Sequence, residues 1–165
     1  MFFSIKKYFR SKKKKMYQSE LIEKLNKEHQ TLFNIVISME EAINKKDIKK
    51  IKKLVDSFKK ELELHLLYED TNLYEHLYNR YYYYENVRDV IQDKHNEMKD
   101  IAKAVQGFIE THQNLDDLEA FNKDFQVVKD VLVKRVSFEE EVLYDIYNKI
   151  YKIDTILEKF KGEEA

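Results

Sequence analysis

HLLYEDTNLYEHL (residues 65–77) and RVSFEEEVLYDIY (residues 135–147) are two copies of one pattern in this chain. Each copy has a glutamate four residues after its first residue, a second acid directly after that glutamate, and Leu-Tyr at matching positions. The first copy begins with His65, whereas the second begins with Arg135. Residues four apart lie on the same face of a helix, so His65 and Glu69 can present a ring nitrogen and a carboxylate to one point. The pattern therefore predicts two helices that offer polar groups to a common core.

The composition around these stretches favours long helices. The chain of 165 residues has no proline, two glycines and 37% charged residues, and a chain of this length most simply forms one domain with a sizeable core. The absence of cysteine excludes disulfides, thiolate zinc sites and cysteine nucleophiles, and it is compatible with the cytoplasmic location that we expect. No glycine-rich phosphate loop or nucleophile elbow supports a hydrolase or a transferase.

Apolar residues recur at steps of three and four along four segments, which predicts four amphipathic helices. The expected N-caps are Ser19 for the first helix, Asp47 for the second, and Asp116 or Asp117 for the fourth. The same spacing places His76 on the inward stripe of the second helix and Val142 on that of the fourth. Four long helices with short connections predict an all-α, up-down-up-down four-helix bundle over residues 19–160.

Residues 1–18 are expected to form a separate basic N-terminal extension. The first fifteen, MFFSIKKYFRSKKKK, contain seven Lys and Arg and no acid, and they include no apolar run near the roughly 20 residues of a membrane span. The extension is expected to be either a solvated tail or an amphipathic segment that places the protein peripherally at a membrane surface. The acidic remainder of the chain argues against a nucleic-acid partner.

Polar residues interrupt the inward stripes at positions where leucine would be usual. They come from all four predicted helices, and they are His29, His65, Glu69, His95, Arg135 and Glu139. A single histidine on such a stripe is more commonly a hydrogen-bonded core residue, but three histidines with two glutamates fit a metal site, because carboxylates can bridge two ions and imidazoles can cap them. A buried carboxylate needs a metal or a cationic partner. His76 has no acidic residue beside it on the stripe and His112 falls in a predicted loop, so neither is expected to bind metal.

At these residues the chain resembles hemerythrin-like proteins of the HHE cation-binding family. The motifs that carry the resemblance are KEHQTLF with His29, HLLYEDTNLY with His65 and Glu69, KHNEMK with His95, and RVSFEEEVLY with Glu139. The resemblance covers roughly residues 19–150. It implies non-haem iron, as one or two ions, at these five residues, with manganese or zinc as alternatives. It also implies a small diatomic ligand and a role in sensing or handling oxygen, nitric oxide, peroxide or iron.

Arg135 departs from the family pattern, because the resemblance places a histidine there. Arginine stays protonated and cannot donate a lone pair to a metal. Lys99 stands where the oxygen-carrying members have a further histidine. Reversible oxygen transport is not expected, because the resemblance associates it with five histidines and two carboxylates, and this chain supplies three histidines at the matching places. Tyr68 and Tyr144 fall near the same site, where a phenolate can bind ferric iron or, as is more common, a tyrosine packs with its hydroxyl at the rim.

Two interpretations of Arg135 stay open at this point. In one interpretation, His29 and His65 hold one ion, and Glu69 and Glu139 bridge towards a second position. Only His95 is left as a ligand for that second position. In the other interpretation, Arg135 pairs with Glu139 and the metal is lost. The protein would then be a degenerate, metal-free four-helix bundle that acts as an interaction or membrane-surface module.

Overall fold

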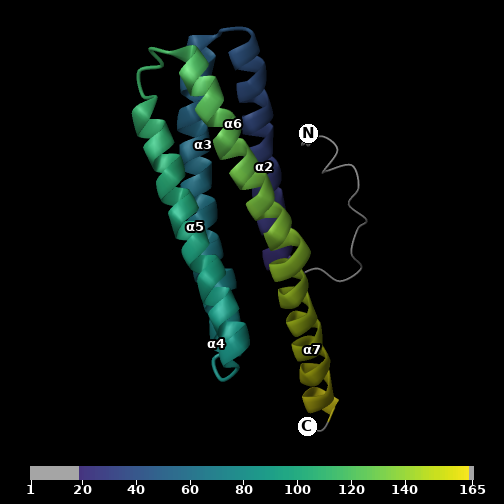
Figure 1. Ribbon diagram of the computed structural model, residues 1–165. Helices are drawn as coiled ribbons and strands as arrows, with labels where there is room; N and C mark the ends of the chain where they lie inside the picture. The colour runs from purple at the N-terminus through teal and green to yellow at the C-terminus, as the bar shows by residue number, and fades with distance from the viewer. Residues whose placement is uncertain (1–18, 164–165) are drawn as a thin grey trace.

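Four rods of helix run side by side in the computed structural model (Figure 1). The structure describes residues 19–163, and it describes the side chains of residues 19–160. The first rod is α2 (Glu20–Asn44), and the second joins α3 (Ile48–Glu69), η1 (Asp70–Tyr74) and α4 (Glu75–Arg80). The third rod is α5 (Glu85–Thr111), and the fourth joins α6 (Leu118–Phe138), η2 (Glu139–Leu143) and α7 (Tyr144–Glu163). The fold is the predicted all-α, up-down-up-down four-helix bundle. The predicted basic extension, residues 1–18, lies outside the described residues.

Side-chain caps fix where three of the rods begin. Ser19 Oγ accepts a hydrogen bond from the Ile22 backbone N–H at 3.3 Å, and Asp47 Oδ1 accepts one from Lys50 at 3.0 Å. Asp117 Oδ1 accepts from the Ala120 N–H at 2.9 Å. Each cap satisfies a helix N–H that would otherwise lack a partner, which is typically worth about 1 kcal/mol. The three caps were all expected from the sequence, and the structure confirms them.

The two π-helices, η1 and η2, coincide with the two copies of the repeated pattern. A π-turn closes its hydrogen bond at i→i+5, so it adds one residue relative to an α-helix and moves the inward face by one position. Leu77 and Leu143 are therefore buried, whereas His76 is exposed and Val142 is 40% exposed. The predicted inward positions of His76 and Val142 are wrong for this reason.

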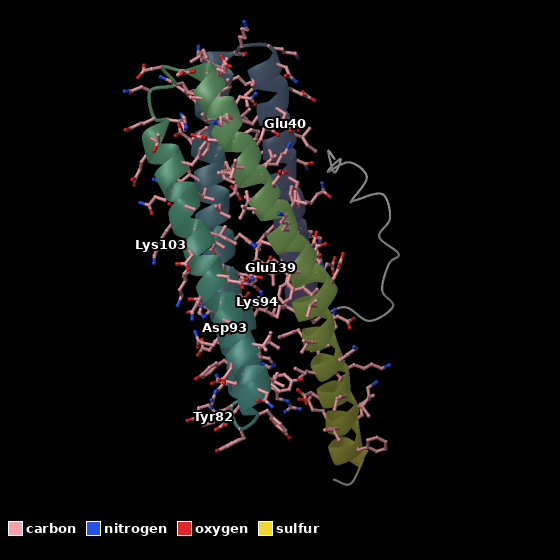
Figure 2. All side chains as sticks on the ribbon, viewed as in Figure 1. Glu40, Tyr82, Asp93, Lys94, Lys103 and Glu139 are labelled. Atoms are coloured by element: carbon pink, nitrogen blue, oxygen red, sulfur yellow. The ribbon has the colours of Figure 1, made fainter. Side chains whose placement is uncertain are left out.

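Two apolar clusters fill the bundle, one on each side of a polar layer. One cluster includes Leu32, Leu62 and Val136, and the other includes Leu25, Leu73 and Leu143. On three rods, the polar residues of the predicted site lie between a member of one cluster and a member of the other. Figure 2 shows Glu139 about halfway along the bundle, far from the end marked by Tyr82. Burial between apolar clusters lowers the local dielectric, which strengthens every polar contact in this layer.

None of the helices that the structure describes is long and apolar enough to span a membrane.

Candidate metal centre

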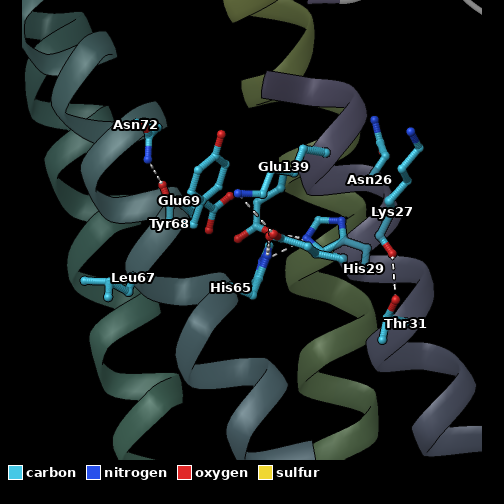
Figure 3. A network of polar contacts seen from close by, with 12 residues as sticks. Asn26, Lys27, His29, Thr31, His65, Leu67, Tyr68, Glu69, Asn72 and Glu139 are labelled. Atoms are coloured by element: carbon cyan, nitrogen blue, oxygen red, sulfur yellow. Dashed lines mark hydrogen bonds and ion pairs between the residues drawn. The ribbon is translucent and has the colours of Figure 1, made fainter. Parts of the chain in front are cut away.

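Three polar side chains converge in this layer from three different rods. His29 comes from α2, His65 from α3, and Glu139 from the start of η2 (Figure 3). The Nε2 atom of His29 lies 3.2 Å from Nε2 of His65 and 3.2 Å from Oε2 of Glu139. One donor atom from each residue lies within 4.8 Å of the other two, and no other group of three such donors occurs among the described residues. All three side chains are buried.

Carboxylates hold the outer nitrogen of both imidazoles. His29 Nδ1 lies 2.9 Å from Oε1 of Glu140, and His65 Nδ1 lies 3.0 Å from Oε2 of Glu28. An imidazole that donates from Nδ1 to a carboxylate keeps its Nε2 lone pair available, and this is the usual support for a metal-binding histidine. Both Nε2 atoms therefore face the centre of the cluster.

The two histidines differ in charge when no cation is present. Burial alone lowers the pKa of His29, but hydrogen bonds to Glu139 and Glu140 more than offset it and raise the pKa to about 9. Burial lowers the pKa of His65, despite its hydrogen bond to Glu28. His29 is thus an imidazolium at neutral pH and donates from Nε2, while neutral His65 accepts at Nε2. The proton on His29 Nε2 therefore lies at the centre of the cluster, within 3.2 Å of both Glu139 Oε2 and His65 Nε2.

Glu69, the last residue of α3, lies beside this group and is fully buried. Its Oε1 accepts a hydrogen bond from the Tyr144 hydroxyl at 3.3 Å, whereas its Oε2 is buried without a hydrogen-bond partner. Burial and the neighbouring Glu139 carboxylate raise the pKa of Glu69 to about 8. A buried oxygen without a partner is rare in folded proteins, and a cation would satisfy it.

Arg135 pairs with Glu139 from the other side. Its Nε donates to Oε1 of Glu139, and its Nη2 donates to the hydroxyl of Tyr74. Burial would raise the pKa of Glu139, but the hydrogen bond from His29 and the charge of Arg135 lower it further than burial raises it. Glu139 is therefore ionised, with one oxygen on each of two cationic groups.

His95, the remaining residue of the predicted ligand set, lies apart from the cluster. Its Nε2 contacts the Asp70 carboxylate, and its ring stacks on Tyr74 with the centroids 4.7 Å apart and the planes at 16°. Four of the five predicted ligand residues thus lie together, and His95 flanks them on α5.

Sequence reasoning missed the residues that position the centre. Glu28 falls on no predicted stripe, and its only signal is that it directly precedes His29. Glu140 and Tyr74 carry a better signal, because each has a counterpart at the same place in the other copy of the pattern. The sequence showed this repetition but gave no role to either residue.

The donor set fits a transition-metal ion. Two imidazole nitrogens and one carboxylate oxygen that meet at one point leave coordination positions open, and this arrangement is typical of non-haem iron(II). Glu69, with its unsatisfied oxygen, can supply a fourth donor.

A sequence model of the hemerythrin HHE cation-binding domain matches residues 20–147. The match spans all four rods and includes every residue of the candidate centre. Comparison with curated proteins and with solved structures gave no match.

Proposed function

This chain belongs to the hemerythrin HHE cation-binding domain family, and from that premise we propose that it is a non-haem iron protein. The proposed ligands are His29, His65 and Glu139, with Glu69 as a further carboxylate. His95 belongs to a second position that has too few donors to hold an ion.

The observation that carries this proposal is the convergence of three donor atoms, because His65 Nε2 and Glu139 Oε2 each lie 3.2 Å from His29 Nε2. A packing histidine needs only a hydrogen-bond partner. Here each ring instead directs one nitrogen to a carboxylate behind it and the other to a shared point. That division of roles is expected of a metal ligand.

The burial of the centre favours a ligand of few atoms. His29, Glu69 and Glu139 are 0%, 0% and 2% exposed, so an organic substrate could not reach them without opening the bundle. A bound iron ion would supply a redox-active Lewis acid at this point. The chain itself excludes bulk water with the apolar clusters above and below, and Tyr144 donates a hydrogen bond to Glu69. We therefore assign the protein to the sensing or handling of oxygen, nitric oxide, peroxide or iron.

The test is the metal content of full-length protein purified from iron-supplemented cells. We expect about one equivalent of iron per chain, and we expect His65→Ala to remove most of it, because removing a ligand lowers metal affinity steeply. His76→Ala is the matched control, since His76 is an exposed histidine on the same rod. Wild-type protein with less than about a tenth of an equivalent of iron, manganese or zinc would contradict the proposal.

A metal-free interaction module is the second candidate, and the Arg135–Glu139 ion pair favours it. A buried ion pair can satisfy a carboxylate without any metal, although it contributes little net stability. On this account, His65→Ala leaves the metal content unchanged and alters only the free energy of unfolding. The same pair of variants therefore separates the two candidates.

A further inference from the structure

The carboxylate of Glu139 is divided between two cationic groups. Its Oε2 faces the candidate centre, 3.2 Å from His29 Nε2. Its Oε1 accepts a hydrogen bond from the guanidinium of Arg135. One oxygen is therefore available to a metal ion, and the other is already bound to a fixed positive charge.

The carboxyl group of Glu69 is divided in a related way. Its Oε1 accepts from the Tyr144 hydroxyl, whose oxygen also lies 3.3 Å from His29 Nε2. Its Oε2 has no hydrogen-bond partner. Both central glutamates thus have one oxygen in the hydrogen-bonded group around His29 Nε2, while the second oxygen is bound to Arg135 in Glu139 and has no hydrogen-bond partner in Glu69.

The second acids of the two copies of the pattern each contact a histidine of another rod, although Glu140 contacts Nδ1 of its histidine and Asp70 contacts Nε2. Glu140 pairs with His29, a histidine on the first rod. Asp70, at the same place in the other copy, pairs with His95 on the third rod. His95 therefore occupies the position that corresponds to His29.

The tyrosine of each copy makes a hydrogen bond to a residue of the other copy. Tyr144 donates to Glu69, which belongs to the other copy. Tyr74, its counterpart, accepts from Arg135, which also belongs to the other copy. The repeat thus relates the group of His29, His65 and Glu139 to an equivalent group, whose members are His95, Arg135 and Glu69.

We propose that the guanidinium of Arg135 permanently fills the second cation position of this repeated site, so that the chain binds one metal ion and not two. The inference rests on the proposed function, because it concerns the stoichiometry of the same centre. Arg135 stands where the repeat has His65, and it contacts the one oxygen of Glu139 that the first position leaves free.

The chemistry of arginine makes this replacement stable. A guanidinium does not lose its proton in a folded protein, so it cannot become a ligand. Arg135 is buried and held at two points, by Glu139 and by Tyr74. A divalent ion placed next to it would meet a fixed like charge in a region of low dielectric, where repulsion is strong. Arg135 therefore supplies part of the positive charge that a second ion would bring.

Tyr74, the second partner of Arg135, connects it to residues outside the candidate centre. Tyr74 stacks on His95, and His95 contacts Asp70. These three residues also line a solvent-open cavity of about 250 Å³ between η1 and α5. An ion could reach the second position through this cavity once Arg135 is replaced.

The experiment compares metal stoichiometry in wild type, Arg135→His and Arg135→Leu, after anaerobic loading with excess iron(II) and removal of unbound metal. We expect one equivalent in wild type and two in Arg135→His, which restores a donor beside His95 and Glu69. Arg135→Leu is the control that removes the charge without adding a donor, and it should bind no more than one. In the oxidised state, wild type should give the paramagnetic resonance signal of an isolated high-spin ferric ion, whereas a coupled pair in Arg135→His should weaken that signal.

The outcomes separate the inference from the proposed function. Wild-type protein without metal contradicts the proposed function. Wild type with two equivalents, or an Arg135→His variant with unchanged helicity that still binds one, contradicts the inference alone. His95→Ala in the wild-type background is a second test, which does not depend on whether Arg135→His folds. It should keep one equivalent, and loss of that ion would overturn the inference.

Discussion

Protons on His29 and Glu69 occupy the candidate metal centre when no cation is bound. The carboxylates around His29 raise its pKa to about 9 although burial opposes this, and burial with the charge of Glu139 raises the pKa of Glu69 to about 8. At neutral pH both groups therefore carry a proton that a metal ion must displace. Because two protons leave when a divalent ion binds, the net charge of the site is the same with and without the ion.

Metal affinity should therefore rise with pH. Below the pKa of Glu69, binding releases about two protons, so affinity should increase by about a hundredfold per pH unit near pH 6.5 and level off above the pKa of His29. Competition between the protein and a coloured chelator for cobalt(II), corrected for protonation of the chelator, measures this slope. An affinity that stays constant from pH 6 to pH 9 would show that these two groups are not ligands.

Glu140→Gln should weaken metal binding by about 10- to 100-fold, since it removes the charged acceptor 2.9 Å from His29 Nδ1. Glu141→Gln is the matched control, because Glu141 is the adjacent acid and is exposed. Titration of both variants with zinc, followed by calorimetry, measures the difference. Equal affinities for the two variants would remove Glu140 from its positioning role.

At the scale of elements, the π-helices η1 and η2 decide which residues face inward after each glutamate. The sequence predicted the beginnings of the helices well, because a cap such as Ser19 or Asp47 is a local signal that requires no knowledge of the partners. It could not predict the inserted residue in η2, since Val142 and Leu143 are both apolar and the pattern alone does not show which of them faces inward. The contact between Tyr74 and Arg135 was also unpredictable, because the two lie 61 positions apart.

The register of η2 can be tested by comparing two neighbouring truncations. Leu143 is 2% exposed and Val142 is 40% exposed. Leu143→Ala should lower the free energy of unfolding by about 2–5 kcal/mol, whereas Val142→Ala should change it by less than about 1 kcal/mol. Urea unfolding of the metal-free protein measures both. An uninterrupted α-helix would place both side chains near the face of Glu139, so a loss for Val142→Ala as large as that for Leu143→Ala would contradict the π-turn.

At the scale of the whole molecule, two apolar clusters enclose one polar layer. Each cluster draws residues from all four rods, so the bundle does not depend on the centre for its packing. The protons on His29 and Glu69 and the Arg135–Glu139 ion pair give most polar groups of the layer a partner without a metal. The sequence indicated this layer because polar residues replaced leucine on the inward stripe of every predicted helix, but it could not show that His95 lies apart from the others.

Removal of the metal should therefore leave a folded but less stable protein. A ligand at about 100 times its dissociation constant stabilises the native state by about 2.7 kcal/mol, which for a chain of this size corresponds to a loss of about 5–10 °C in Tm on chelation. Circular dichroism during thermal unfolding, with and without an iron chelator, measures both helicity and Tm. Complete unfolding on chelation, or an unchanged Tm in a protein that had carried iron, would contradict this view of the bundle.

The position of the bound ion tests the central claim most directly. Crystals of iron-loaded protein, measured on both sides of the iron absorption edge, should give one anomalous peak per chain, in contact with His29, His65 and Glu139. A peak beside His95 and Asp70, or no peak in protein that contains iron, would contradict the account.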